Sequence, residues 1–364
     1  MAIADVKYMR MALTLASKGA GRVLPNPQVG AVIVKNGMVI GKGYHHHFGG
    51  PHAEVMAFND AMTSVDGATL YITLEPCNHE GKTPPCAPLI VKKGIREVFI
   101  GMEDPNPLVK TKSIKYLEEN GIKVTSGILE NKVRQQNEAY IKYIISGLPF
   151  CTLKTGMTLD GKIATISGQS RWITGEKSRS LVQKLRNDAD AIMVGINTVL
   201  IDNPSLRPVL NGRHPKEPLK IILDSHLRIP LTSKVLTENP QLTIVATTDT
   251  AEITAIKNIE RLGAQVMICH AKENMIDLKL LMVRLGKMDI SSLMIEAGSA
   301  LAFSALREKI VDKMICFIAP KILGGTKAPM AVGGEGIGTL EKAIAVRDMK
   351  IKRVGEDIMI TGYF

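Results

Sequence analysis

The residues with the clearest chemistry lie between His52 and Cys86. A His-Ala-Glu triplet opens this stretch at His52, and two cysteines follow at Cys77 and Cys86. One imidazole and two thiolates are ligands that Zn²⁺ takes in catalytic sites, where a fourth position stays open for water. Glu54 follows the histidine by two residues, close enough to reach that water without binding the metal. The sequence therefore predicts one catalytic zinc ion, with Glu54 as the proton carrier.

A histidine, a glutamate two positions later and a downstream Pro-Cys-x-x-Cys are typical of zinc-dependent nucleobase deaminases. Here eight residues separate the two cysteines instead of two, and Gly81, Pro84 and Pro85 supply turns that let such an insert return. The alternative is a closed structural zinc site with His79 as the fourth ligand. That alternative leaves Glu54 without a role, so a catalytic ion is favoured.

The length of 364 residues exceeds what one hydrophobic core usually serves, so we expect two domains. A glycine and a proline follow a long helical pattern near residue 147, and they mark the expected boundary between domains 1–147 and 148–364. No apolar run is long enough to span a membrane.

The charge and the distribution of cysteines indicate what kind of substrate and which cellular compartment to expect. The net charge of +11 is spread along the chain without a polybasic block, and aromatic residues make up only 4%. Few stacking platforms then exist for single-stranded nucleic acid, whereas small phosphorylated substrates suit a diffuse positive balance. Cys151, Cys269 and Cys316 are widely scattered, which favours a reducing compartment and predicts a cytoplasmic protein.

The first half alternates strand and helix patterns, which predicts an α/β layer fold. Asn36-Gly37 between two apolar runs predicts a hairpin. We expect helices over residues 4–19, 53–61, 88–93, 113–120 and 130–145, and strands over 31–34, 38–41, 68–74, 97–100 and 123–127.

Two loop residues of the first half could contact a substrate. Prolines on both sides present the Asn26 amide from a loop, where it suits the edge of a pyrimidine or a ribose hydroxyl, although an ordinary turn asparagine would look the same. Within the triplet His45-His46-His47, neighbouring side chains of an extended chain point to opposite faces. We therefore expect only one or two of them to face the zinc pocket, with His45 as the candidate.

Glycine-rich turns follow the strand patterns of the second half. Strands are expected over residues 150–155, 189–195 and 293–296, and helices over 178–186 and 301–306. Turns at 195–198, 297–300 and 323–326 could offer free backbone N–H groups to a phosphate. No Gly-x-Gly-x-x-Gly follows a strand, so the second domain has another cofactor fold than the standard Rossmann type, or no cofactor.

The chain resembles the bifunctional deaminase/reductases of riboflavin biosynthesis over nearly its whole length. In the first half the shared motifs are Asn26-Pro27, Val29-Gly30, His52-Ala53-Glu54 and the block from Glu75 to Cys86. In the second half they are Leu159-Asp160-Gly161-Lys162, Ser170 to Thr174, Thr198-Val199, Asp202 to Leu206 and Glu296 to Ser299. The spacing of the two cysteines is the most specific element, because it separates this family from cytidine and transfer-RNA adenosine deaminases.

This resemblance implies an α/β protein with a cytidine-deaminase-like three-layer domain and a dihydrofolate-reductase-like domain. The first would remove the 2-amino group of a diaminopyrimidinone ribosylamino 5′-phosphate, with one Zn²⁺ per chain. The second would reduce the ribosyl group of the product to ribityl with NADPH. Small phosphorylated pyrimidines are the expected partners, with no nucleic acid and no membrane, and we expect a homo-oligomer, either a dimer or a tetramer.

The resemblance also implies residue roles. The deaminase substrate would contact Asn26, His45, His79 and Lys82. The reductase substrate would contact Lys154, Ser170, Arg186, Leu206, Arg207 and Glu296. NADPH would contact Gly156, Trp172, Thr198, Asp202, Ser225, Gly298, Ser299, Ala300, Leu301, Ala302, Phe303 and Ser304.

Two positions depart from the family pattern. The family usually has Thr-x-Arg directly after the Leu206 position, whereas this chain reads Arg207-Pro208-Val209, so the arginine is displaced. Glycines usually flank the lysine that follows Asp-Pro-Asn-Pro, whereas Thr111 and Ser113 flank it here.

Other functions are compatible with parts of the sequence. A nucleic-acid deaminase would explain the zinc motif and the charge, but it leaves residues 148–364 without a role and lacks an aromatic-rich channel. A non-catalytic module held together by zinc would be indifferent to the Glu54 carboxylate. The second half could be an α/β scaffold that binds no nucleotide.

Overall fold

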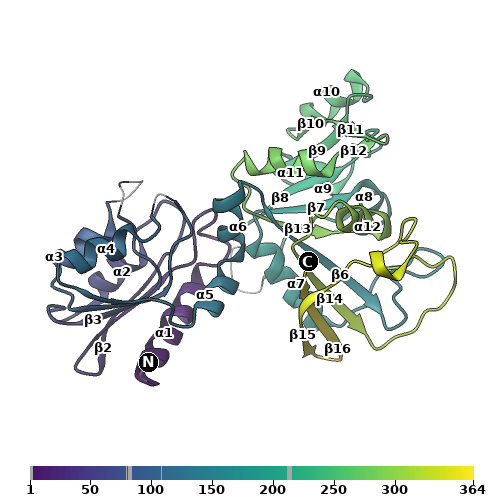
Figure 1. Ribbon diagram of the computed structural model, residues 1–364. Coiled ribbons are helices and arrows are strands. Elements are labelled where there is room, and N and C mark those ends of the chain that lie inside the picture. Colours follow the sequence, from purple (N-terminus) through teal and green to yellow (C-terminus); the bar gives the residue numbers. More distant parts are fainter. Residues whose placement is uncertain (1–2, 79, 81–83, 108, 211–214) are drawn as a thin grey trace. The chain divides into compact units, whose positions relative to one another are not determined.

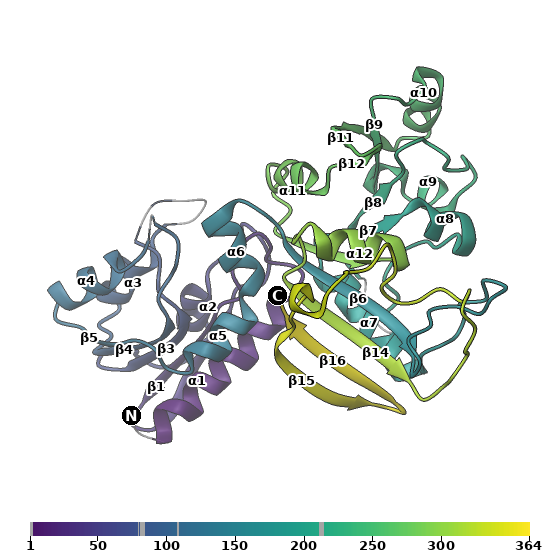
Figure 2. The same ribbon diagram turned by 45° about the vertical axis from the view of Figure 1, so that its right-hand side comes forward.

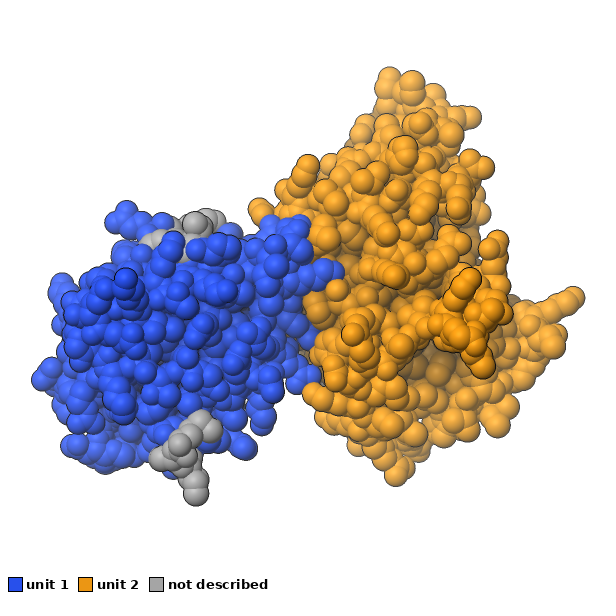
Figure 3. Space-filling view, viewed as in Figure 1, with its two compact units in different colours: residues 1–147 blue, residues 148–364 orange. Residues whose placement is uncertain are grey.

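The computed structural model describes residues 3–78, 80, 84–107, 109–210 and 215–364 (Figure 1). The chain divides into two compact units, Met1–Gly147 and Leu148–Phe364, coloured blue and orange in Figure 3. Each unit buries hydrophobic clusters of its own. Within the described ranges, every helix is too short or too polar to cross a membrane.

The first unit is built on a five-stranded sheet in the order β2-β1-β3-β4-β5. Its strands are β1 (Gly30–Lys35), β2 (Met38–Tyr44), β3 (Thr69–Leu74), β4 (Glu97–Met102) and β5 (Lys123–Thr125). β1 pairs antiparallel with β2 and β3, and β3, β4 and β5 run parallel. At the β1–β2 turn, Asn36 (φ 52°) and Gly37 (φ 76°) both adopt the left-handed conformation of a tight hairpin, which confirms the hairpin prediction.

Helices cover both faces of this sheet, which gives three layers (Figure 1). They are α1 (Ile3–Ala16), the 3₁₀ turn η1 (Ser17–Gly19), α2 (Ala53–Asp60), α3 (Cys86–Lys92), α4 (Lys112–Glu119), α5 (Glu130–Gln136) and α6 (Glu138–Ser146). Successive strand residues face opposite sides. Ala31 and Ile33 therefore pack in the core beneath α2, α3 and α4, while Val32 and Val34 pack against α1.

A continuous helix over 130–145 was predicted, and the structure shows two helices separated at Asn137 instead. The backbone at Asn137 leaves helical geometry (φ −111°, ψ 21°), and its buried side chain turns to the loop before β1. There Asn137 Oδ1 accepts from Gln28 N at 2.7 Å, and Asn137 Nδ2 donates to Gln28 O at 3.1 Å. The break thus ties the Asn26–Gln28 loop to the last helices of the unit.

Close packing also sets the position of α2, which begins directly after His52. A Cβ added at Gly43 would lie 2.2 Å from the carbonyl oxygen of Ala53. Only glycine at this position of β2 lets the first turn of α2 approach the sheet so closely. The helix predicted over 88–93 begins earlier than expected, at Cys86, because the backbone N–H groups of Cys86 and Ala87 both bond to Cys77 O.

The second unit contains a nine-stranded sheet in the order β10-β9-β8-β7-β13-β6-β14-β16-β15. Its strands are β6 (Phe150–Thr158), β7 (Ala191–Gly195), β8 (Leu219–Leu223), β9 (Thr243–Thr248), β10 (Gln265–Cys269), β13 (Ser292–Glu296), β14 (Lys313–Ala319), β15 (Arg347–Val354) and β16 (Asp357–Tyr363). The strands from β10 to β14 are parallel, and the β15–β16 hairpin adds two antiparallel strands at one edge. β11 (Ala271–Lys272) and β12 (Met275–Ile276) form a separate small hairpin.

Helices pack on both faces of this sheet (Figures 1 and 2). They are α7 (Glu176–Asp188), α8 (Ile196–Asp202), α9 (Lys234–Thr237), α10 (Ile253–Arg261), α11 (Leu278–Gly286) and α12 (Ser299–Arg307), with 3₁₀ turns η2 (Pro240–Leu242) and η3 (Leu340–Lys342). One core lies under α11 and α12, and the other lies under α8, α9 and α10. The strand predicted over 150–155 extends to Thr158 in the structure. The helix predicted over 178–186 is α7, which is two residues longer at each end.

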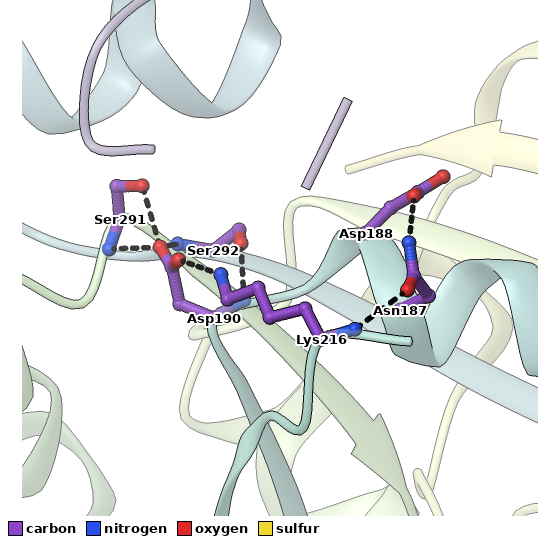
Figure 4. A network of polar contacts seen from close by, with 6 residues as sticks. All are labelled: Asn187, Asp188, Asp190, Lys216, Ser291 and Ser292. Carbon is purple, nitrogen blue, oxygen red and sulfur yellow. Dashed lines mark hydrogen bonds and ion pairs between the residues drawn. The ribbon is translucent and has the colours of Figure 1, made fainter. Parts of the chain in front are cut away.

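A polar network ties together the amino ends of three strands (Figure 4). Asp190, just before β7, accepts hydrogen bonds from the backbone N–H groups of Ser291 and Ser292 and from the Ser291 hydroxyl. Lys216, just before β8, contributes an ion pair to the same carboxylate at 2.9 Å. The network aligns β7, β8 and β13, whose opposite ends carry the site of this unit.

Candidate active sites

Three potential metal ligands converge in the first unit. His52 caps the start of α2, Cys77 lies in the loop after β3, and Cys86 is the first residue of α3. His52 Nδ1 lies 3.5 Å from Cys77 Sγ and 3.4 Å from Cys86 Sγ, and the three ligand atoms lie within 4.8 Å of one another. Tetrahedral zinc would hold nitrogen and sulfur about 3.6 Å apart. The donor set therefore fits one zinc ion, and three protein ligands leave a position open.

The cysteine pair already favours a thiolate. Hydrogen bonding from Cys86 and His52 lowers the pKa of Cys77 to about 4. A thiolate rather than a thiol is the form that binds metal. The backbone N–H of Cys86 also points at Cys77 Sγ, at 3.4 Å, which closes the eight-residue insert at its base.

Glu54 lies in the same cavity as His52 and Cys77, a hollow of about 310 Å³. Its side chain is buried, and burial raises its pKa to about 7. A carboxyl group with a pKa near neutrality can both take up and release a proton under physiological conditions. The structure thus places a buried carboxyl group in the same cavity as His52 and Cys77.

Asn26 and His45 line this cavity and contact each other. His45 Nδ1 lies 3.0 Å from the carbonyl oxygen of Pro51, which can only accept, so Nδ1 carries the proton. His45 Nε2 then accepts from the Asn26 amide at 3.2 Å. Burial lowers the pKa of His45, which keeps the ring neutral and fixes the orientation of the Asn26 amide.

Sequence reasoning missed a buried glutamate that shapes one wall of the cavity. Glu75 Oε2 accepts from the backbone N–H groups of Asp104 and Thr111, each at 3.1 Å, and Oε1 accepts from the Ser113 hydroxyl at 2.6 Å. Asp104 lines the cavity, and its carboxylate accepts from Tyr140 at 2.7 Å. The signal for this residue in the sequence is the Glu-Pro-Cys motif, in which Glu75 lies two residues before the potential metal ligand Cys77.

Thr111 and Ser113 replace the glycines that the family usually has in the loop after β4, and the structure shows what each of them does. Thr111 adopts a left-handed backbone (φ 59°), a conformation that glycine adopts most readily. Ser113 uses its hydroxyl to bond Glu75, as described above. His79 and Lys82, predicted to contact substrate, lie outside the described residues.

A larger cavity of about 1000 Å³ lies in the second unit, at the carboxyl ends of its parallel strands. This edge is where ligands bind in open α/β sheets. Fifteen of the residues predicted for this unit line it: Lys154, Gly156, Ser170, Trp172, Arg186, Thr198, Asp202, Leu206, Ser225, Glu296, Gly298, Ser299, Ala300, Leu301 and Ser304.

An ion-pair cluster forms the floor of this cavity. Strand register places Glu296 of β13 beside Lys154 of β6, with Lys154 Nζ 2.8 Å from Glu296 Oε2. Arg186 of α7 binds both carboxylate oxygens, at 2.6 and 3.0 Å. Burial alone would raise the pKa of Glu296, but the two cations together hold it well below its ordinary range.

The loop that carries Trp172 is fixed from two sides. Ser170 donates to Asp202 Oδ1 at 2.9 Å, and Lys321 Nζ donates to the carbonyl oxygen of Trp172 at 2.8 Å. The indole itself stays exposed (63%) and lies under the Arg179 guanidinium, 4.8 Å from the ring centroid. A large aromatic surface is thus presented to the cavity.

Comparison with known proteins decides the family. The "RibD C-terminal domain" family matches residues 149–360, and the "Cytidine and deoxycytidylate deaminase zinc-binding region" matches residues 3–102. The riboflavin biosynthesis protein RibD of Actinobacillus pleuropneumoniae is 44% identical over 98% of this chain and 94% of that protein. The chain belongs to the RibD family. The RibD of Aquifex aeolicus is 42% identical over 98% of this chain and 97% of that protein.

Solved RibD structures share the fold. Acinetobacter baumannii RibD superposes with a TM-score of 0.88 at 35% identity, over 99% of this chain and 98% of that one. A Thermotoga maritima protein, described as a diaminohydroxyphosphoribosylaminopyrimidine deaminase/5-amino-6-(5-phosphoribosylamino)uracil reductase, gives the same score, identity and coverage. The predicted fold is confirmed, with a cytidine-deaminase-like first domain and a RibD reductase domain. The chain is a bifunctional enzyme of riboflavin biosynthesis that uses Zn²⁺ and NADPH.

Three residues predicted for the RibD reductase site do not line the cavity. Ala302 and Phe303 are buried on the face of α12 that packs inside the unit, because only one face of a helix can meet the cavity. Arg207 turns away and pairs with Glu217 at 2.8 Å and with Glu238 at 4.0 Å. The structure therefore does not bring these three side chains to the site.

Proposed function

We propose that residues 1–147 hydrolyse the 2-amino group of a diaminopyrimidinone ribosylamino 5′-phosphate and release ammonia. We propose that residues 148–364 then reduce the ribosyl group of the product to ribityl. The observation that carries this proposal is the convergence of His52, Cys77 and Cys86 beside buried Glu54, in a chain that aligns with RibD proteins over nearly its full length. The Thermotoga maritima description names substrates of this chemistry.

In the deaminase site the chain supplies three metal ligands, a proton carrier and two side chains that orient the pyrimidine. Bound Zn²⁺ lowers the pKa of its water towards neutrality, which supplies the nucleophile. Glu54 would take one proton from the attacking water and pass it to the ring nitrogen. It would then carry the second proton of that water to the amine, which leaves as ammonia as the C–N bond breaks. Asn26 and His45, already bonded to each other, hold the edge of the pyrimidine. We also assign His79 and Lys82 to the substrate by their place in the motif.

In the reductase site we assign residues to two ligands. Lys154, Ser170, Arg186, Leu206 and Glu296 contact the substrate. Gly156, Trp172, Thr198, Asp202, Ser225, Gly298, Ser299, Ala300, Leu301 and Ser304 contact NADPH, which supplies the hydride when bound. The Lys154–Glu296 pair offers a donor and an acceptor to the hydroxyls of the ribosyl chain.

The single tryptophan gives a direct test of the reductase assignment. Because Trp172 is the only tryptophan in the chain and lines the larger cavity, its fluorescence reports on that cavity alone. Titration with NADPH should change this fluorescence to saturation. At 100 times the dissociation constant, NADPH should stabilise residues 148–364 by about 2.7 kcal/mol. No fluorescence change and no thermal protection would remove the reductase assignment.

We further propose a homo-oligomer in which the edge strand β15 meets a second copy. Residues Arg347 to Arg353 are all exposed, and Ile351, 69% exposed, pairs with Ile360 of β16 on one face. Most side chains of β15 are charged, but Met349 and Ile351 are exposed apolar ones, and an unpaired strand edge is a template for pairing with another chain. Ile351→Lys should therefore shift the mass in light scattering towards the 39.6 kDa of one chain. Lys350→Ala, on the opposite face, should leave it unchanged, and a wild-type monomer would refute the proposal.

We place the protein in a reducing compartment, the cytoplasm. All five cysteines are free thiols, and two of them belong to the proposed metal site. Oxidising compartments favour disulfides instead. Fractionation of cells that express the chain should recover it with cytoplasmic markers, and recovery from an oxidising compartment would contradict the assignment.

A further inference from the structure

The reductase cavity needs cations for the phosphate of its substrate, and one of the two arginines predicted to contact that substrate, Arg207, does not line the cavity. This requirement rests on the function proposed above, in which the substrate is a 5′-phosphate. Arg207 is engaged by Glu217 and Glu238 and does not line the cavity. Phosphate binding commonly uses the planar donors of arginine, so we expect a second arginine of the cavity to act beside Arg186.

One face of α7 lines the substrate side of the cavity. Arg179, Val182, Gln183 and Arg186 all line it, and their spacing of three, four and seven residues places them on one face of a helix. Arg179 and Arg186 are separated by about 10 Å along the helix axis, within reach of a common ligand for two long side chains.

The segment after Leu206 lies directly against this face. Val209 N donates to Gln183 Oε1 at 3.0 Å. Position 209 is where the family pattern usually has its arginine, and here it carries an apolar side chain. Gln183 lies one turn from Arg179 and one turn from Arg186. Arg179 and Arg186 are therefore the cavity-lining arginines of α7 that lie nearest to Val209.

Arg179 and Arg186 differ in how far carboxylates neutralise their positive charge. Arg186 binds both oxygens of Glu296, which also pairs with Lys154. Arg179 donates only to a carbonyl oxygen, that of Thr174, at 2.6 Å, and no carboxylate of the described residues lies within ion-pair distance of it. Arg179 thus keeps an uncompensated charge that faces the cavity.

The remaining cations of the cavity are engaged, lie with residues that we assign to the cofactor, or lie on elements other than α7. Arg171 donates to the carbonyl oxygen of Asp202, which we assign to NADPH, at 2.7 Å. Lys234 is the first residue of α9, next to the Asn203 turn. Lys272 pairs with Glu308 at 2.9 Å, and Arg307 pairs with Glu273 at 3.6 Å. Arg228 donates to Asn197 at 3.3 Å, in the part of the lining that includes Ser225 and Thr198, which we assign to NADPH. None of these cations lies on the α7 face that carries Arg186.

We propose that Arg179 binds the 5′-phosphate of the reductase substrate, in place of Arg207, which the family resemblance assigns to that substrate. Its guanidinium, held over Trp172 and bonded to Thr174 O, is oriented before substrate arrives. Arg186 adds a second cation from the same helix face (α7 in Figure 1). Arg179 is therefore a specificity determinant for phosphorylated over dephosphorylated substrate.

The test compares the reductase substrate with and without its 5′-phosphate. Arg179→Ala should lower kcat/KM for the phosphorylated substrate by about 10- to 100-fold, the worth of one charge-assisted hydrogen bond, and leave the dephosphorylated substrate unaffected. Arg179→Lys should restore part of the loss. Ribose 5-phosphate binding, measured by calorimetry on the full chain, should weaken by a similar factor, while NADPH affinity from Trp172 fluorescence stays unchanged. Arg207→Ala is the matched control and should keep the phosphate preference.

Several results would overturn the inference while leaving the proposed function intact. Arg179→Ala could reduce both substrates equally, or weaken NADPH alone, which would mean that Arg179 acts only by positioning Trp172. Loss of the phosphate preference in Arg207→Ala, or in Arg213→Ala from the segment outside the described residues, with none in Arg179→Ala, would assign the phosphate elsewhere. If the wild-type chain reduces neither substrate, the proposed function itself fails.

Discussion

Replacing Glu54 with glutamine is expected to lower kcat for deamination by about 10²- to 10⁴-fold, the usual contribution of a general acid–base group. The change keeps the size of the side chain and its buried position but removes the carboxylate that carries the proton. The three metal ligands are untouched, so zinc content should stay at one per chain. The measurements are ammonia release and metal analysis on the same preparation.

The matched control is Glu118→Gln, which changes an exposed glutamate on α4 and should leave turnover unchanged. Reductase activity of Glu54→Gln, assayed with the deaminated substrate, should also be unaffected because the two units have separate cores. A Glu54→Gln protein that releases ammonia at the wild-type rate would show that the zinc site is only structural. Loss of zinc together with loss of turnover would instead give Glu54 a role in metal binding.

Removing the Glu296 carboxylate is expected to have the largest effect in the second unit. Glu296→Ala leaves Lys154 and Arg186 as neighbouring cations, 17% exposed, without their shared counter-charge. Such a change typically costs about 3–5 kcal/mol of unfolding free energy. Reductase turnover should fall to background, while ammonia release persists. Denaturant unfolding followed by Trp172 fluorescence measures the stability of this unit.

The pH dependence of this effect follows from the lowered pKa of Glu296. A carboxylate whose pKa is lower in the folded chain stabilises the fold above its unfolded pKa of about 4.3. That stabilisation is lost as the pH falls through the folded pKa. Glu296→Gln, which keeps the shape, should therefore differ from wild type most at neutral pH and progressively less below about pH 4. A difference that does not change with pH would show that the ion pairs contribute nothing.

The local parts of both sites could be predicted from the sequence because each depends on a short motif. His52, Glu54, Cys77 and Cys86 have types and spacings that few other structures require, and the structure brings them together. The Asn36-Gly37 hairpin was predictable for the same reason, since its backbone conformation is decided by the two residues themselves.

What could not be predicted depends on contacts between distant residues. The helix break at Asn137 exists because its amide bonds to Gln28, more than one hundred residues earlier. Arg207 was assigned to the cavity by its neighbours in sequence, but two glutamates on other segments draw it away. The contacts of Glu75 and the position of Arg179 in the cavity likewise depend on how the loop after β4 and one face of α7 are placed.

The most direct test of the central claim is zinc content measured alongside ammonia release from the diaminopyrimidinone ribosylamino 5′-phosphate. One zinc per chain is expected, with ammonia release that stops when a chelator removes the metal and returns when zinc is restored. Cys86→Ala should lose both properties together. Full ammonia release from a zinc-free chain, or one bound zinc with no release, would contradict the account.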